Sequence, residues 1–109
     1  MSTFFPAREE CSEHTIFPGV TIRTCAAEKM MMSDVDLQPG AVVHEHSHPH
    51  EQVGMVLEGK AHFFIGDEDR VLGPGDMYRI PGHVKHRVIA LESRVRALDI
   101  FFPIREDYR

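Results

Sequence analysis

The sequence predicts an all-β protein, either a sandwich or a barrel of short strands. Apolar and polar residues alternate along short segments, most clearly over 29–38. Glycine and proline turn signals such as Pro39-Gly40 separate these segments at regular intervals. No helical period persists along any stretch of the chain. Several short strands divided by regular turns are typical of antiparallel sandwiches and barrels.

The first half of the chain is expected to form three main strands. Pro18-Gly19 places a turn near the start of a strand over 15–26. Residues 29–38 form a half-buried strand, because their apolar side chains fall on alternate positions. After a Pro-Gly turn, a strand begins at Ala41 and runs into a cluster of histidines.

The second half is expected to contain shorter strands between tight turns. Gly59 ends a strand over 52–58, and a charged turn at 67–70 follows a strand over 60–66. Further strands are expected at 71–72, 77–80, 86–91 and 95–102.

A length of 109 residues suits one domain. Within it we expect an N-terminal arm with edge strands over 1–28 and a barrel over 29–109. The net charge of −5 argues against a nucleic-acid partner, which calls for a basic surface. No apolar run is long enough for a membrane span, and residues 1–6 lack the basic and long apolar regions of a signal peptide, so a cytoplasmic location is expected.

Four of the eight histidines lie in the stretch His44–Gln52. Imidazole is the commonest metal ligand in proteins, so this stretch is a candidate metal site. If the strand runs on, His46, His48 and Gln52 share one face, because their spacing is even. The alternative is a solvated, histidine-rich loop. A closed barrel could also bring a later histidine, His86, across to the same place.

Two stretches, 40–59 and 75–86, resemble the two sequence motifs of the cupin family. The first reads G-x5-H-x-H-x3-Q-x6-G and the second reads G-x5-P-G-x3-H. The resemblance implies a double-stranded β-helix, or jelly-roll barrel, that is usually a homodimer. It also implies one divalent transition metal inside the barrel, such as Ni, Zn, Mn or Fe. The implied ligands are His46, His48, Gln52 and His86.

The sequence departs from the cupin pattern at two positions. Gln52 stands where a glutamate ligand is usual, and His83 stands where a glycine is common. Three neutral imidazoles and a neutral amide would leave the full 2+ charge on the metal, which makes the ion a stronger Lewis acid. The alternative is a failed site that binds no metal.

An acid stands out in the last predicted strand. Alternation puts Ala97, Asp99 and Phe101 on one face. Burying a carboxylate is costly, so an acid in such an apolar strand calls for a reason. The functional interpretation is a general acid/base that faces the barrel interior. The alternative is an aspartate that faces solvent on a half-exposed strand.

The segments HSHPHEQ, LEG and DIFFPIRED resemble the small cupins of the KdgF type. These proteins open the ring of 4,5-unsaturated monouronates in pectin and alginate breakdown, without a redox step. The resemblance implies a small anionic sugar as substrate. It assigns the acid/base role to Asp99, packing on the sugar ring to Phe101, and carboxylate binding to Arg105.

Three other functions stay open from the sequence: a metal-dependent dioxygenase, a non-catalytic sugar-binding cupin, and a sugar isomerase or epimerase. A dioxygenase is compatible with the ligand set, since three histidines can hold iron. His44 and His50 are expected at the rim of the site. Arg79 is a further candidate for binding the substrate carboxylate.

Overall fold

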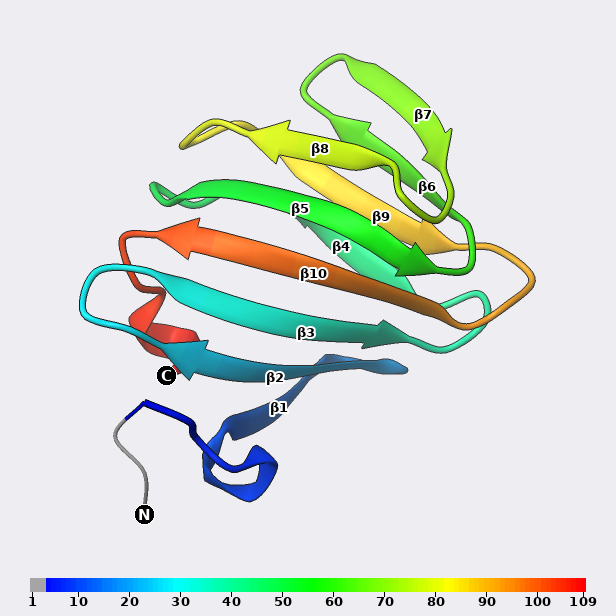
Figure 1. Ribbon diagram of the computed structural model, residues 1–109. Helices are drawn as coiled ribbons and strands as arrows, with labels where there is room; N and C mark the ends of the chain where they lie inside the picture. The colour runs from blue at the N-terminus through cyan, green and yellow to red at the C-terminus, as the bar shows by residue number, and fades with distance from the viewer. Residues whose placement is uncertain (1–3) are drawn as a thin grey trace.

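Two antiparallel sheets pack face to face in the computed structural model, which describes residues 4–109 (Figure 1). One sheet has six strands in the order β1-β2-β3-β10-β5-β8, and the other has four in the order β4-β9-β6-β7. The bounds of these ten strands are β1 Ser12–Phe17, β2 Val20–Ala26, β3 Met31–Leu37, β4 Val42–His46, β5 Glu51–Glu58, β6 Ala61–Ile65, β7 Glu68–Leu72, β8 Met77–Ile80, β9 His86–Ala90 and β10 Val95–Phe102. Two short 3-10 turns, η1 Arg8–Glu10 and η2 Glu106–Tyr108, complete the described elements. Between residues 4 and 109, no helix is long and apolar enough to cross a membrane.

The hydrophobic core lies between the two sheets. It is built from side chains that alternate inward along each strand, such as Val35 and Leu37 of β3 and Ala97 of β10, with Ala61 and Phe63 of β6 opposite them. The prediction of an all-β jelly roll is therefore confirmed, and the alternation that predicted it sets which residues face the interior.

Several strand boundaries differ from the expectation. The segment 15–26 is two paired strands, because Pro18-Gly19 makes the hairpin turn between β1 and β2. The expected charged turn at 67–70 is wrong, since β7 begins at Glu68 and pairs with β6. The turn lies earlier, where Gly66 has a positive φ of 61° that favours glycine.

The N-terminal strands belong to the larger sheet. β2 pairs with β3 along its whole length, and β1 adds the outermost strand beside β2. The expected division into an arm at 1–28 and a barrel at 29–109 stays a prediction, and residues 1–3 lie outside the described part of the chain.

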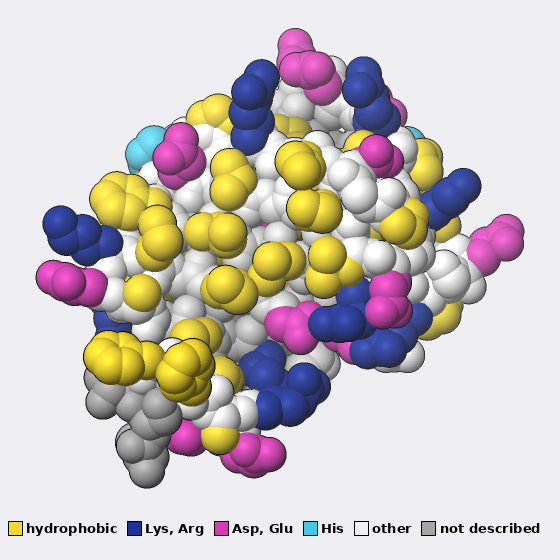
Figure 2. Space-filling model, in the orientation of Figure 1, with side chains coloured by type: hydrophobic (Ala, Val, Ile, Leu, Met, Phe, Trp, Pro, Cys, Tyr) yellow, Lys and Arg dark blue, Asp and Glu magenta, His cyan; other side chains and the backbone are white. Residues whose placement is uncertain are grey.

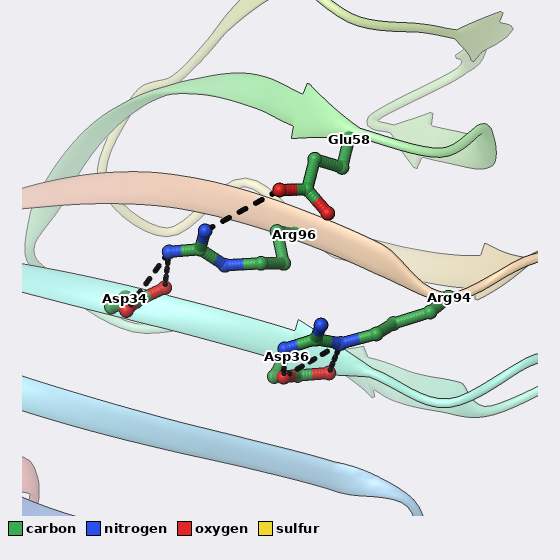
Figure 3. A network of polar contacts seen from close by, with 5 residues as sticks. All are labelled: Asp34, Asp36, Glu58, Arg94 and Arg96. Carbon is green, nitrogen blue, oxygen red and sulfur yellow. Dashed lines mark hydrogen bonds and ion pairs between the residues drawn. The ribbon is translucent and has the colours of Figure 1, made fainter.

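The outer face of the six-stranded sheet is apolar over much of its area (Figure 2). At one end of this face, ion pairs join neighbouring strands (Figure 3). Arg96 of β10 binds Asp34 of β3 and Glu58 of β5, while Arg94 binds Asp36 of β3. The network therefore links the three central strands β3, β10 and β5 on the side away from the core.

Candidate metal centre and active site

Three histidines meet at one end of the space between the sheets. His46 ends β4, His48 lies in the loop after it, and His86 begins β9. His46 and His86 are partners in the β4–β9 ladder, with ring centroids 4.3 Å apart. One nitrogen from each of the three rings lies within 4.8 Å of the others. The fold thus brings together the histidines of both motifs.

The route by which His48 reaches this cluster differs from the expectation. β4 stops at His46, and the next strand, β5, begins only at Glu51 and belongs to the other sheet. The loop over 47–50 therefore crosses between the sheets. His48 and Gln52 approach His46 through this crossing, so the condition that one strand runs on from His46 to Gln52 is not met, while the separate strand expected at 52–58 is present as β5.

Hydrogen bonds fix the same tautomer in all three rings. A backbone carbonyl can only accept, so a ring nitrogen bonded to one carries the proton. The Nδ1 atoms of His46, His48 and His86 bond to the carbonyl oxygens of His44, His50 and Val84, at 2.8, 3.1 and 2.9 Å. Each Nε2 then carries a lone pair, and the Nε2 of His86 is buried without a partner among the described residues.

Gln52 supplies a fourth donor atom. Its Oε1 lies 3.1 Å from Nε2 of His48, so two acceptor atoms face each other. Such a pair is repulsive unless a cation binds both. Three imidazole nitrogens and an amide oxygen therefore form a donor set that fits a divalent transition metal.

Electrostatics favour the neutral imidazole in two rings of the cluster, those of His48 and His86. Burial, together with the positive charge of Arg105 and the other histidines, lowers the pKa of His48 to about 4. Burial also lowers the pKa of His86. Neutral imidazole is the form that coordinates a metal, so these rings are ready to bind one at neutral pH.

Asp99 lies beside this cluster on the inner face of β10. Its side chain is buried, and burial raises its pKa to about 6 against the opposing effect of hydrogen bonds from Tyr78 and Gln52. The alternative of a solvent-facing aspartate is therefore wrong. An isolated carboxylate in this position would be costly, and these two donors reduce that cost.

Tyr78 is a residue of the site that the sequence interpretation missed. Its hydroxyl donates a hydrogen bond to Oδ1 of Asp99, and burial keeps the pKa of the phenol above its ordinary value. Alternation along β8 puts Tyr78 and Ile80 inside and leaves Arg79 exposed outside, so Arg79 does not line the interior cavity. The sequence did contain a clue to this position: Tyr78 lies two residues before the apolar Ile80, and alternate residues of a strand face the same side.

The C-terminal segment completes the cavity. Arg105 is buried after β10, and its guanidinium lies 3.8 Å above the ring of Tyr108 and 5.5 Å from that of Phe101. One edge of the guanidinium bonds to Asp107, through Nε at 3.3 Å and a terminal nitrogen at 2.9 Å. The cavity between the sheets is lined by polar groups from both motifs, from β10 and from this segment: His46, Gln52, His86, Asp99 and Arg105.

The two flanking histidines occupy different surroundings. His44 is exposed and packs edge-on against Phe17, with ring centroids 5.0 Å apart. His50 packs edge-on against His48 at 5.4 Å. That either residue contacts a substrate stays a prediction.

Comparison with known proteins places the chain among cupins. Residues 33–101 match the sequence model of the cupin domain. The structure of KdgF from Halomonas sp. is 32% identical, covers 96% of this chain and 97% of its own, and superposes with a TM-score of 0.85. An RmlC-like cupin from Shewanella frigidimarina is 28% identical, with a TM-score of 0.88 over 99% of this chain and 97% of its own.

A curated relative is similar over a shorter stretch. The L-ectoine synthase of Rhodococcus opacus is 35% identical over 72 residues, which is 64% of this chain and 54% of that enzyme. The chain thus spans about half the length of the curated relatives it matches.

Proposed function

This chain belongs to the cupin family, as a small cupin of the KdgF type, and from that premise we propose that it opens the ring of 4,5-unsaturated monouronates. The product would be the linear 5-keto acid. The observation that carries the proposal is a buried carboxylate, Asp99, that shares one cavity with His46, Gln52 and His86 of the histidine and glutamine donor set.

The donor set would hold one divalent transition metal. His46, His48, Gln52 and His86 fit such an ion, because their free lone pairs converge. When bound, the ion would supply Lewis-acid stabilisation of negative charge on substrate oxygens. Its identity stays open, since imidazole suits several metals of this series.

Asp99 would carry both proton transfers. As a base it would take the proton of the anomeric hydroxyl, so that C1 becomes a carbonyl carbon and the C1–O5 bond breaks. The electron pair of that bond moves to O5 and gives an enolate over C4, C5 and O5. Protonated Asp99 would then return its proton to C4, which leaves the ketone at C5. A carboxyl pKa near 6 suits both the uptake and the release of the proton by Asp99 at neutral pH.

Arg105 and Phe101 would bind and orient the sugar. The edge of the guanidinium opposite Asp107 carries further N–H groups, which can bind the uronate carboxylate by charge-assisted hydrogen bonds. Phe101 forms an apolar wall beside His48, with ring centroids 5.8 Å apart, against which the sugar ring can pack. The arrangement supports a small anionic sugar as the substrate.

The experiment uses the unsaturated monouronate released by a pectate or alginate lyase. We expect the purified, metal-loaded protein to speed the loss of absorbance of the conjugated double bond, without oxygen. Asp99→Ala with unchanged metal content should abolish this acceleration. An active Asp99→Ala variant would contradict the role of Asp99. Loss no faster than without protein, or oxygen uptake on another substrate, would contradict the proposal and favour the binding or dioxygenase functions.

A homodimer and a cytoplasmic location also stay predictions for this protein. The apolar outer face of the six-stranded sheet is where we expect a second copy to pack.

A further inference from the structure

One cross-strand row on the inner face of the six-stranded sheet is polar. From β3 through β10 and β5 to β8, the paired residues are Ser33, Asp99, Gly54 and Tyr78. The adjacent row toward the core, which includes Val35, Ala97 and Val56, is apolar. Asp99 and Tyr78 are therefore not on neighbouring strands, because β5 lies between them.

Gly54 is what allows these two side chains to meet across β5. A Cβ at this position would overlap both Oδ1 of Asp99 and the phenol oxygen of Tyr78. Gly54 does not lie in the positive-φ region, so no turn requires a glycine here. Glycine within a strand weakens it and often marks a close approach of another group. The gap thus exists where the hydroxyl of Tyr78 reaches the carboxylate.

The contact restricts Asp99. The hydroxyl of Tyr78 donates to Oδ1, and the Tyr78 ring packs on Phe63 with centroids 4.5 Å apart. A ring held by core packing has little freedom, so its hydroxyl holds the carboxylate at a fixed angle. Small displacements of a reacting group are enough to lower a rate by about 100-fold.

We propose that Tyr78, reaching through the gap at Gly54, is a positioning residue that holds the carboxylate of Asp99 in its reactive orientation toward the bound sugar. This role rests on the proposed function and deepens it. Tyr78 contacts the Asp99 carboxylate rather than the sugar, and it acts on the sugar through that carboxylate. This arrangement needs two features. One is the hydroxyl of Tyr78 on β8, and the other is the absence of a side chain at Gly54 on β5, the strand between Tyr78 and Asp99.

The test compares Tyr78→Phe with the wild type. This variant keeps the ring and removes the hydrogen bond. We expect kcat on the unsaturated monouronate to fall about 10- to 100-fold, while KM stays within about threefold. Metal content per chain, the melting temperature, and the affinity for saturated galacturonate measured by calorimetry should match the wild type.

Two further variants separate positioning from packing. Phe63→Leu disturbs the packing of the Tyr78 ring but keeps its hydroxyl, so it should lower the melting temperature with a smaller loss of kcat. Gly54→Ala should lower kcat although Asp99 and Tyr78 are both present, and the double variant with Tyr78→Phe should lose no more than the larger single loss.

The outcomes distinguish the two proposals. An active wild type with an equally active Tyr78→Phe variant would overturn the positioning role alone. A Tyr78→Phe variant that loses metal or stability together with kcat would show a structural role and overturn it as well. A wild type that does not accelerate ring opening would remove the proposed function and the positioning role with it.

Discussion

Gln52 is the residue that joins the two halves of the site. Its amide oxygen faces His48, and the amide also hydrogen-bonds Asp99. An amide can accept on one side and donate on the other, whereas an ionised glutamate at this position would have no proton to give. The departure from the usual glutamate therefore has a second consequence besides the charge that a bound metal would keep. Because Gln52 is neutral, Asp99 has no second negative charge beside it.

A first prediction concerns Gln52→Glu. The new carboxylate removes a donor from Asp99 and adds a negative charge, and both changes raise the pKa of Asp99 above its value of about 6. Since Asp99 must be ionised to act as the base, wild-type kcat should fall as pH drops through about 6, and this acid limb should move to higher pH in the variant. A pH profile of kcat measures the shift.

The control for that experiment is Glu51→Gln, which changes the charge by one unit at the exposed neighbouring position. Its profile should match the wild type. An unshifted acid limb in Gln52→Glu with retained metal would show that Asp99 does not set the pH dependence.

At the scale of the strands, the sequence predicted which face of a strand each side chain occupies better than it predicted which strands lie side by side. Strict alternation was enough to put Asp99 and Phe101 on the inner face of β10, because side-chain direction has a period of two. The contact of Tyr78 with Asp99 could not be predicted in the same way. It depends on the pairing of β10, β5 and β8, which are far apart in the chain, and on the gap at Gly54.

The loop after β4 illustrates the same limit. The even spacing of His46, His48 and Gln52 would put them on one face only if a single strand ran through all three, yet the chain leaves one sheet after His46 and enters the other before Gln52. The motif residues converge because the chain passes from one sheet to the other between them. The local alternation of residues does not predict such a passage.

Strands β1 and β2 have a functional consequence through the C-terminal turn. The carbonyl oxygen of Tyr108 accepts hydrogen bonds from Oγ1 of Thr24 on β2 at 2.6 Å and from Nε2 of His14 on β1 at 3.0 Å. The ring of Tyr108 lies against the guanidinium of Arg105. The N-terminal strands thus hold the segment that carries Arg105, the residue proposed to bind the substrate carboxylate.

A second prediction follows for Thr24→Val, which removes one of these bonds at nearly constant volume. The protein should lose about 1 kcal/mol of unfolding free energy. KM for the uronate should rise severalfold with a smaller change in kcat, because Arg105 is held less firmly while Asp99 is untouched. Thr21→Val, a partly exposed position on the same strand, is the matched control and should leave KM unchanged. Equal KM values in both variants would contradict the anchoring role.

For the whole molecule, the notable surface is the outer face of β3, β10, β5 and β8 (Figure 2). Exposed apolar side chains from these strands and their ends gather there: Met30, Met32, Val53, Leu57, Met77 and Phe102. Large exposed apolar patches are rare on monomeric proteins, so a patch of this kind often marks an interaction site. The Arg–Asp pairs at one end satisfy their own charges, so they can border a buried surface without leaving a lone charge inside it (Figure 3).

A third prediction is that two copies pack through this face around a twofold axis. An isologous contact applies the same patch to itself, so a single charge on it enters the interface twice and opposes its own copy. The wild type should therefore have about twice the chain mass of 12.4 kDa in light scattering, and Met32→Lys should shift it toward the monomer. Val71→Lys is the matched control, because Val71 on β7 is 47% exposed against 49% for Met32 but lies on the other sheet. A wild type that stays monomeric at high micromolar concentration, or a Val71→Lys variant that dissociates equally, would contradict this assembly.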